Sequence, residues 1–478
     1  MRKVRLFVDG RWCEGSGGAE IDVLDPATGT AVARLCQASD GDLARALDAA
    51  SRGFDLWRSV SPEARASLLR ASAAQLRERV DEIAAVLTAE QGKPIAQARG
   101  ELLGTIGYFL EMAELALAIP DRSVADAAAG MRRVIAHEPV GPIYAVSPWN
   151  MPALLPARKI AIAIAAGCSV VLKPAEETPE TIVRIVECCV AAGLPPGVVN
   201  LVHGPAAAVS DAMLASPVIR KLSFTGSTAV GRLLSARAGE RLIPVSMELG
   251  GHAPVIVCED VDVGATAAAL ARARHANAGQ SCMAPTRFFV ADAIHDRFVA
   301  AYAAEAAALR IGPGADPATD MGPLATPRRV AAMQRLVDDA LGKGARLVTG
   351  AAALEGPGWF YPPTVLGDVP SDAAILSEEP FGPVTPILRF ADEVEAVAQA
   401  NTTDYGLAAY VFSADDARAG RIAAQLRTGL VAVNSTQIVS PQVPFGGIGA
   451  SGNGREGAIE GLLQAMVTKT VSIPLDAG

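Results

Sequence analysis

Residues 140–172 read VGPIYAVSPWNMPALLPARKIAIAIAAGCSVVL, in which two short apolar runs flank a longer one. We interpret residues 140–146 as a strand, residues 153–166 as a helix and residues 169–172 as a second strand. A helix is predicted next, at residues 178–192, where apolar residues recur at the helical period. Strands that alternate with helices in this way are typical of a parallel sheet. The segment therefore predicts an α/β fold.

The same alternation continues toward the C-terminus. Predicted strands at residues 198–202 and 219–224, and a helix at residues 228–238, extend the first α/β unit. Predicted strands at residues 245–248 and 254–257 open a second unit. Because 478 residues are many for a single hydrophobic core, two or three domains are expected.

The N-terminal third of the chain is rich in alanine and predicts three helices. These lie near residues 41–55, 61–89 and 97–118. Residues 120–135 interrupt the helical pattern with a polar, turn-rich stretch. One interpretation of this stretch is a flexible surface loop.

Composition narrows the class of protein. Half of the residues are hydrophobic and 19% are charged, which fits a soluble globular protein. The net charge of -9 gives no basic footprint, so no nucleic-acid partner is expected. The most apolar stretch, residues 160–172, is short and interrupted by Gly167, so no membrane span is expected. Seven scattered cysteines favour a reducing cytoplasm over a disulfide framework, and their spacing offers no metal site.

The tetrad Gly279-Gln280-Ser281-Cys282 is the strongest functional signal in the sequence. A lone cysteine is usually a small buried hydrophobe, which is our interpretation of the other six. Cys282 differs because small polar residues precede it and a predicted helix ends just before it, so its sulfur is expected to be accessible. A thiolate is a strong nucleophile once its pKa is lowered. We therefore predict that Cys282 is a nucleophile.

Three motifs upstream supply the groups that such a thiol needs. They are Pro148-Trp149-Asn150-Met151-Pro152, Phe224-Thr225-Gly226-Ser227-Thr228 and Glu248-Leu249-Gly250-Gly251. A thiol, a carboxylate, a side-chain amide and a small-residue turn for phosphate can together oxidise an aldehyde through a thioester. In this order the motifs resemble those of the aldehyde dehydrogenase superfamily, and the likeness extends from residue 6 to residue 471.

The resemblance implies a fold and a domain plan. It implies an α/β protein with two doubly wound parallel-sheet domains and a small oligomerisation hairpin and strand. Residues 1–119 and 137–247 are expected to form an NAD-binding domain, and residues 248–454 a catalytic domain. Residues 120–136 and 455–478 are expected to form the oligomerisation arm of a homodimer or homotetramer.

The resemblance also implies catalytic roles. Cys282 attacks the aldehyde, and the side-chain amide of Asn150 stabilises the resulting alkoxide together with the backbone N–H of Cys282. The other interpretation is that Asn150 closes a turn after a strand, and the two are compatible. Glu248 activates the water that hydrolyses the thioester, unless it is a solvated or capping residue. Because relatives that transfer the acyl group to coenzyme A typically lack this carboxylate, Glu248 favours release of a free acid.

The cofactor site has no standard fingerprint. No Gly-x-Gly-x-x-Gly follows a predicted strand, and residues 226–231 have P-loop glycine spacing without the following lysine. Gly226 and Ser227 nevertheless open a predicted helix after a strand, and a helix N-terminus can hold a pyrophosphate. By resemblance, Lys173 binds ribose hydroxyls and Glu176 binds the diol of the adenosine ribose. Since a carboxylate there repels a 2′-phosphate, NAD is expected rather than NADP.

Further cofactor residues follow from the resemblance alone. Glu379 is expected to hold the nicotinamide ribose, and Phe381 to pack beside the nicotinamide. The other expected contacts come from the ends of predicted strands, at Ser147, Trp149 and Leu249.

The substrate residues are expected on the helix that follows the Asn150 motif. Met151, Leu154, Leu155 and Arg158 are spaced so that one helix face can line a channel. Arg158 matches an arginine that succinate semialdehyde enzymes use to bind a distal carboxylate. The alternative for Arg158 is an ion pair at the surface or at a subunit interface.

Two positions near the C-terminus complete the expected substrate pocket. Ser440 matches a serine that the same enzymes use for the carboxylate. Phe445 belongs to the segment Pro444-Phe445-Gly446-Gly447, which begins four residues after that serine. A second arginine of those enzymes is replaced here by Ala276. The expected substrate is therefore a semialdehyde or another aldehyde with a polar tail.

These observations predict NAD-dependent oxidation of a small aldehyde to its carboxylic acid. The intermediates are a cysteine thiohemiacetal and a thioester, which water activated by Glu248 hydrolyses. Two alternatives remain, a CoA-acylating semialdehyde dehydrogenase and a catalytically silent structural or binding relative.

Overall fold

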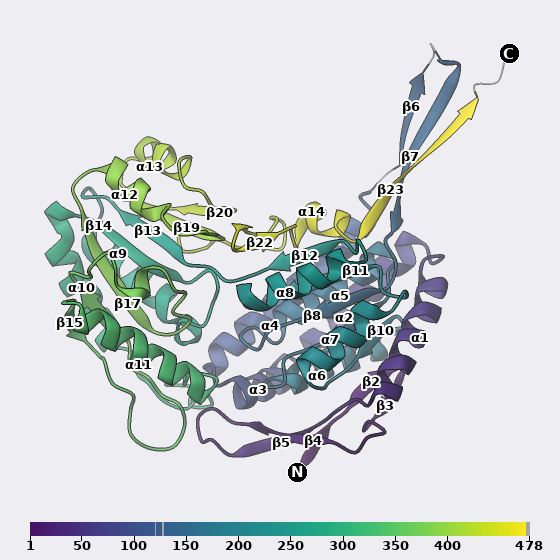
Figure 1. The fold of residues 1–478 in the computed structure, drawn as a ribbon, viewed down its shortest axis with the longest axis horizontal. Coiled ribbons are helices and arrows are strands. Elements are labelled where there is room, and N and C mark those ends of the chain that lie inside the picture. The colour runs from purple at the N-terminus through teal and green to yellow at the C-terminus, as the bar shows by residue number, and fades with distance from the viewer. Residues whose placement is uncertain (120, 127–128, 475–478) are drawn as a thin grey trace.

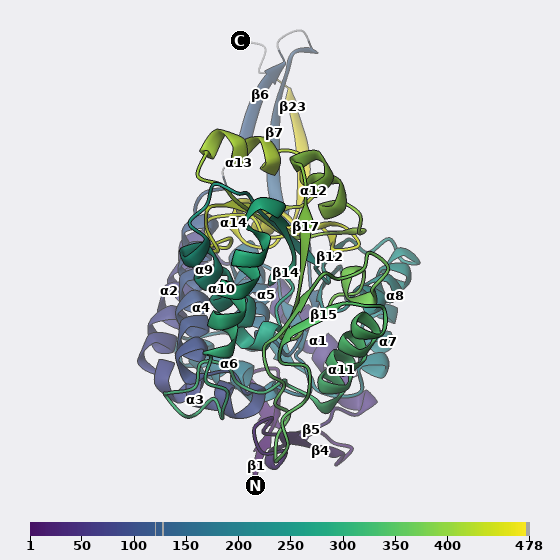
Figure 2. The same cartoon turned by 90° about the vertical axis from the view of Figure 1, so that its left-hand side faces the viewer.

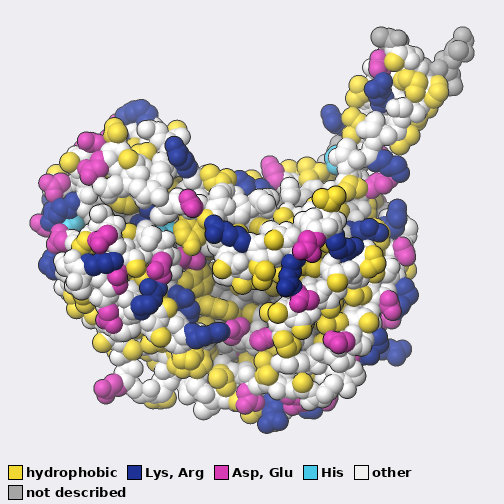
Figure 3. Space-filling view, viewed as in Figure 1, with side chains coloured by type: hydrophobic (Ala, Val, Ile, Leu, Met, Phe, Trp, Pro, Cys, Tyr) yellow, Lys and Arg dark blue, Asp and Glu magenta, His cyan; other side chains and the backbone are white. Residues whose placement is uncertain are grey.

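The computed structural model describes residues 1–119, 121–126 and 129–474. Two α/β units lie side by side, and a narrow β-arm stands away from the body in both views (Figures 1 and 2). The chain enters the first unit, leaves it for the second near residue 250, and returns at its C-terminal end. Basic and acidic side chains are interspersed over the face shown in Figure 3.

The first unit is built on a sheet whose inner strands are parallel. Its strands are β2 (Leu6–Val8), β3 (Arg11–Cys13), β8 (Ile143–Val146), β9 (Val170–Lys173), β10 (Val199–Leu201), β11 (Lys221–Thr225), β12 (Val245–Glu248) and β22 (Gly452–Asn453). Among the described residues their order is β22-β12-β11-β8-β9-β10-β2-β3. The run from β12 to β10 is parallel, and β22, β2 and β3 pair antiparallel. The strand order reverses between β8 and β11, which is where ligands bind in such sheets.

Helices pack around this sheet. They are α1 (Asp40–Trp57), α2 (Pro62–Glu78), α3 (Val80–Gln91), α4 (Ile95–Ala116), α5 (Leu154–Ala166), α6 (Pro179–Ala191), α7 (Ala206–Ala215) and α8 (Thr228–Gly239). Helix α5 is apolar on nearly all sides and is buried from Leu155 to Ala166, as expected of a core helix. It ends at Gly167, whose φ of 86° is the left-handed conformation that glycine adopts readily.

The second unit has its own, mostly parallel sheet. Its strands are β13 (Ala253–Val257), β14 (Pro285–Ala291), β15 (Arg346–Thr349), β16 (Thr364–Gly367), β17 (Val384–Phe390), β19 (Ala408–Phe412) and β20 (Leu430–Val433). Their order is β15-β16-β17-β14-β13-β19-β20, with only β15 antiparallel among the described strands. The helices of this unit are α9 (Val263–His275), α10 (His295–Ala307), α11 (Pro327–Gly342), α12 (Glu393–Ala400) and α13 (Asp416–Ala423).

Smaller sheets complete the described fold. The arm joins β6 (Arg122–Asp126), β7 (Met131–Pro139) and β23 (Met466–Pro474) in one antiparallel sheet, and helix α14 (Ala458–Leu463) precedes β23. A second sheet holds β1 (Arg2–Val4), β4 (Glu20–Leu24) and β5 (Ala31–Cys36), and a third pairs β18 (Tyr405–Gly406) with β21 (Ile448–Gly449). The hairpin interpretation of residues 120–135 therefore holds for the described part, while residues 120, 127 and 128 lie outside it.

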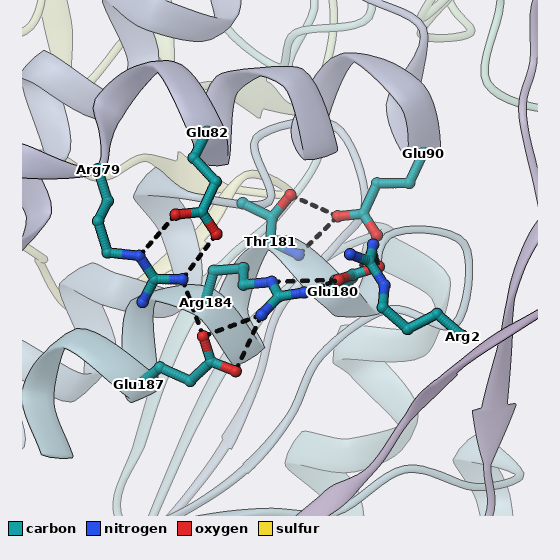
Figure 4. A network of polar contacts seen from close by, with 8 residues as sticks. All are labelled: Arg2, Arg79, Glu82, Glu90, Glu180, Thr181, Arg184 and Glu187. Carbon is teal, nitrogen blue, oxygen red and sulfur yellow. Dashed lines mark hydrogen bonds and ion pairs between the residues drawn. The ribbon is translucent and has the colours of Figure 1, made fainter.

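A buried carboxylate ties the end of α3 to the start of α6 (Figure 4). Glu90 accepts hydrogen bonds from the backbone N–H groups of Glu180 and Thr181, at 2.8 Å each. The residue before this helix, Thr178, makes no side-chain cap of its own, so Glu90 caps α6 from another helix. Burial raises the pKa of Glu90 to about 8.

Several features of the fold were not among the expectations above. The single helix expected at residues 61–89 is two helices, because Arg79 leaves the helical conformation and pairs with Glu82 and Glu187 (Figure 4). The sequence pattern also did not predict helix α7. Finally, β22 lies in the stretch expected to belong to the catalytic domain, and it pairs with β12 of the first sheet.

Candidate active site

The carboxyl ends of the parallel strands β8 and β9 carry several of the expected site residues. Strand β8 leads into Ser147, Trp149 and Asn150, and its neighbour β9 ends with Lys173. The two strands pair in parallel, so their carboxyl ends share one edge of the sheet.

Two more strands bring the next motifs to the same edge. On the other side of β8, β11 leads into Gly226 and Ser227, and the next strand, β12, ends with Glu248. These strands also run parallel to β8. Residues that lie far apart in the sequence meet here, because each crossover connection returns the chain to the same side of the sheet.

Cys282 follows α9 and a short 3-10 turn, Ala276–Gly279. Within that turn Asn277 and Ala278 both have a φ of 52°, the left-handed region that non-glycine residues seldom adopt. Gly251 approaches closely, since a Cβ atom there would lie 2.0 Å from the carbonyl oxygen of Cys282. The glycine that closes the Glu248 motif is thus needed to bring the two segments together.

The cysteines differ in exposure. The residue Cys282 as a whole is partly exposed. Five of the other six cysteines are buried, as expected of small hydrophobes. Cys13 is the exception: it is also partly exposed, because it ends the edge strand β3.

Asn150 is tied to the cysteine loop by its side chain and by its backbone. Its Nδ2 donates to the carbonyl oxygen of Gln280 at 3.1 Å. Its own carbonyl oxygen accepts from Nδ2 of Asn277 at 2.9 Å. The side-chain oxygen of Asn150 is buried and has no hydrogen-bond partner among the described residues. The side-chain amide therefore contacts the loop within two residues of Cys282, and its oxygen accepts no hydrogen bond from a described residue.

Glu248 is buried, with 2% of its surface exposed. Neither carboxylate oxygen has a hydrogen-bond partner within the described part of the chain. Burial raises the pKa of Glu248 well above its usual range; the charge of Glu456 adds to this, and Arg158 opposes it. A carboxyl group whose pKa is moved upward in this way suits general base catalysis near neutral pH.

The surroundings of Cys282 keep its thiol protonated in the protein alone. Burial of the sulfur raises the pKa of the thiol to about 12, and the charges of Glu379 and Glu248 act in the same direction. Arg158 lowers it, but by less. A base or a nearby positive charge is therefore needed to generate the thiolate.

A cavity of about 380 Å³ opens beside the cysteine loop. Ser281 and Met283, on either side of Cys282, both line it. Met151 and Leu154 line it from the Asn150 segment, and Ala276 lines it where the resemblance places a second arginine. The other walls include Lys93, Gln97, Glu101, Tyr410, Ile438 and Val439.

Leu155, Arg158, Ser440 and Phe445 do not line this cavity. Leu155 and Phe445 are buried, and the hydroxyl of Ser440 donates to Gln442 at 3.1 Å. Of the residues expected to line the substrate channel, Met151 and Leu154 lie on its wall. Contact of the other four with substrate stays a prediction.

Arg158 is buried in the first unit, with 1% of its surface exposed. Its guanidinium carbon lies 4.3 Å from the ring centroid of Tyr108 and 5.0 Å from that of Phe445. Nη1 is 3.5 Å from Oε2 of Glu456, yet Nε and Nη1 make no hydrogen bond to any described residue. The ion pair considered as an alternative thus exists, but it is internal and not at the surface.

The residues expected to bind the phosphates and the adenosine ribose lie close to the strand ends. Ser227 caps α8, its hydroxyl accepting from the N–H of Val230 at 3.4 Å. Nζ of Lys173 is 3.5 Å from Oε1 of Glu176. The hydroxyl of Ser147 is buried and has no partner among the described residues.

The residues expected at the nicotinamide end come from both units. Oε1 of Glu379 accepts from the N–H of Gly251 at 2.9 Å, and burial raises the pKa of Glu379 to about 7. The rings of Phe381 and Trp149 meet edge-on, with centroids 5.4 Å apart. Leu249 is buried, and its N–H donates to the carbonyl oxygen of Ser451 at 3.0 Å.

Sequence reasoning missed Lys159 and Glu456, two charged residues that pair beside Arg158. Nζ of Lys159 lies 2.5 Å from Oε1 of Glu456 and 2.9 Å from Oγ of Ser223. Two adjacent basic residues in an otherwise apolar helix, Arg158 and Lys159, are a signal that a buried acid has to face them. Nothing in the local sequence identifies that acid as Glu456.

Nearly the whole chain fits one known family. The family model for the aldehyde dehydrogenase family matches residues 12–471, so the chain belongs to the aldehyde dehydrogenase family. It is therefore an oxidoreductase that oxidises aldehydes to acids.

The chain is similar in sequence to several known proteins over nearly their full length. The chain is 44% identical to 4-(hydroxymethyl)benzenesulfonate dehydrogenase of Comamonas testosteroni, covering 97% of each. It is 39% identical to the NADP(+) succinate-semialdehyde dehydrogenase of Escherichia coli, covering 98% of each. A solved succinate-semialdehyde dehydrogenase from Burkholderia pseudomallei superposes with a TM-score of 0.96 at 38% identity, covering 98% of each chain.

No helix in the described residues is both long and apolar enough to cross a membrane. No three His, Cys, Asp or Glu side chains in the same residues are placed to share a metal ion.

Proposed function

We propose that this aldehyde dehydrogenase oxidises an aldehyde with an anionic or otherwise polar tail to the free carboxylic acid, with NAD as oxidant and a thioester on Cys282. The observation that carries the proposal is the junction between the units. There the loop of Cys282 meets Asn150, and the strand that ends in Glu248 is joined through Gly251 to the same loop.

The residues at the strand edge fit a nicotinamide dinucleotide. A helix N-terminus at Ser227 and a buried hydroxyl without a described partner at Ser147 are the donors that a phosphate-bearing ligand needs. In this proposal Lys173, Glu176 and Glu379 hold the two riboses, and Phe381 and Trp149 pack at the nicotinamide end. When bound, the cofactor accepts the hydride from the substrate.

Cys282 begins the reaction by attacking the aldehyde carbon. The thiol must first lose its proton, and its raised pKa means that a base is required. The addition converts the carbonyl oxygen to an alkoxide, which the amide of Asn150 stabilises by hydrogen bonding. Loss of hydride from the thiohemiacetal leaves a thioester on the sulfur.

Glu248 completes the reaction by removing a proton from water, which attacks the thioester. The acid leaves and the thiol of Cys282 is restored. The buried oxygens of Glu248 support this role, because no hydrogen bond from a described residue occupies either of them. Hydrolysis by Glu248 also favours a free acid over a CoA ester as the product.

The proposed choice of NAD rests on Glu176. Its carboxylate lies beside Lys173 at the end of β9, where it would repel a 2′-phosphate. One relative is named as an NADP(+) enzyme, so cofactor choice needs its own measurement. We expect a higher kcat/KM with NAD than with NADP, and the reverse preference would contradict the role of Glu176.

The proposed substrate class rests on Arg158. Two of its guanidinium nitrogens are buried without a hydrogen bond within the described residues, and such donors suit a carboxylate or sulfonate. The names of the two similar enzymes refer to compounds that carry such a group, a benzenesulfonate and succinate semialdehyde.

Replacing the nucleophile tests the reaction. Cys282→Ser should show no NADH formation with any aldehyde of a panel, while NAD still binds, because a thioester requires the sulfur. Cys258→Ser is the matched control, since Cys258 is buried in the core of the second unit, and it should stay active. Parental turnover by Cys282→Ser would overturn the mechanism.

We further propose a cytoplasmic homo-oligomer that assembles through the β6–β7–β23 arm, with the first unit binding NAD and the second supplying the nucleophile. All seven cysteines, each of which lies in the described part of the chain, are free, which supports a reducing compartment. The arm stands away from the body and pairs only with itself within the described residues, which supports a role in subunit contacts.

A further inference from the structure

A buried ion pair joins helix α4 to the segment that carries Asn150. Lys93 lies between α3 and α4, and its Nζ is 2.5 Å from Oε2 of Glu101 in α4. Only 2% and 3% of the two side chains are exposed. Both residues also line the cavity beside the cysteine loop. An ion pair in such a place needs further hydrogen bonds to offset the loss of hydration.

Lys93 makes its second polar contact with the backbone of Asn150. Its ammonium group donates to the Asn150 carbonyl oxygen at 2.9 Å, the same oxygen that Asn277 binds from the cysteine loop. Its third contact is with Sδ of Met151, at 3.4 Å. The peptide group that follows Asn150 is thus held by one donor from each unit.

Glu101 holds the other end of the same turn. Its Oε1 accepts from the N–H groups of Ala153 and Leu154, at 2.8 and 3.0 Å. These are the amides of the cap residue and of the first residue of α5, and Ala153 has no polar side chain with which to cap the helix. The Lys93–Glu101 pair therefore clamps residues 150 to 154 at both ends.

We propose that Lys93 and Glu101 are positioning residues that fix the Asn150 amide where the alkoxide forms. The inference rests on the proposed role of Asn150. A donor stabilises a developing charge best when it is held in place before the reaction begins. Neither residue needs to touch the substrate for this purpose, because both act through the turn that carries Asn150.

The first test is Lys93→Met, which keeps an unbranched side chain of similar size and removes the ammonium group. We expect the rate of NADH formation in a single turnover to fall about 10- to 100-fold, as for a misplaced catalytic group. KM for NAD should stay near the parental value, because the contacts of the pair lie in the turn at residues 150–154 and not at the ends of β9 and β11. Lys93→Arg, which keeps a donor, should recover part of the rate.

A double-substitution cycle separates positioning from general stability. In an Asn150→Ala background the clamp has no amide to orient, so Lys93→Met should cause little further loss of rate. Glu101→Gln is measured in the same cycle and keeps an oxygen that can accept from the first amides near α5. It provides a second variant of the ion pair in case Lys93→Met does not fold. Glu90→Gln is the matched control: it alters another buried cap, at the start of α6, and kcat should stay parental.

Two results would overturn the inference while leaving the proposed function intact. One is a parental single-turnover rate in Lys93→Met and Glu101→Gln when Asn150→Ala is impaired. The other is the same fold loss in both backgrounds, which would show that the pair acts independently of Asn150. Parental activity of Asn150→Ala itself would instead remove the proposed role of Asn150, and the inference with it.

Discussion

Arg158 is a buried cation, and two of its guanidinium nitrogens have no hydrogen bond to a described residue. Its guanidinium lies between the rings of Tyr108 and Phe445. A buried charged donor without a hydrogen bond costs roughly 1–3 kcal/mol or more, which is a reason to expect a ligand for it. Its charge also lowers the pKa of both Cys282 and Glu248 against the effect of their burial.

We therefore predict a substrate-dependent effect of Arg158→Lys. Lysine keeps a positive charge beside Glu456 but loses the planar fork that binds a carboxylate with two hydrogen bonds. KM for succinate semialdehyde or 4-carboxybenzaldehyde should rise roughly 10- to 150-fold, which corresponds to about 1.5–3 kcal/mol. Benzaldehyde, which has no anionic tail, is the control and should be little affected. Equal losses for charged and neutral aldehydes, measured by NADH absorbance, would contradict this role.

At the level of helices and strands, the sequence is most informative where apolar residues are periodic or continuous. Helix α5 and strands β8 and β9 are predicted to within a few residues, because buried elements of a parallel sheet are almost wholly apolar. The break between α2 and α3 is not predicted, because Arg79 is neither proline nor glycine. It is stabilised by ion pairs with Glu82 and with the distant Glu187, which no local pattern reveals.

The cap that Glu90 provides to α6 predicts a pH dependence of stability. Its pKa rises from an ordinary 4.5 to about 8 on folding, so the folded protein keeps a proton that the unfolded chain releases. The free energy of unfolding that this bound proton contributes is fully present below pH 4.5 and is lost as the pH rises through 8. Between pH 4.5 and pH 8 the Tm of Glu90→Gln should therefore fall less than the Tm of the parental protein. The Tm is measured by circular dichroism at each pH. An equal fall in Tm for the variant and the parental protein would contradict the raised pKa of Glu90.

At the scale of the whole molecule, the site depends on contacts that sequence order hides. The motifs predict the nucleophile loop, the amide and the carboxylate. The clamp on Asn150 and the acid beside Arg158 come from residues far away in the chain, Lys93, Glu101 and Glu456. Their distances follow from the way in which the two sheets and α4 pack, which periodicity alone does not specify.

The exposed residues of the β6–β7–β23 arm predict how subunits assemble. Val467 and Val471 are 45% and 42% exposed, and as alternate positions of β23 they lie on one face. Exposed valines on a projecting strand suit a subunit contact. Replacing both by Asp should reduce the mass measured by light scattering to that of a single chain. The matched control is Thr468→Asp, on the opposite face of the strand. A parental mass in the double variant would contradict assembly through this face.

The most direct test of the thioester mechanism is pre-steady-state NADH formation by Glu248→Gln. If Glu248 serves the hydrolysis of the thioester, hydride transfer should survive its loss while release of the acid becomes slow. The account predicts a burst of up to one NADH per active subunit, followed by a steady state far below the parental rate. Steady turnover at the parental rate, without a burst, would contradict it.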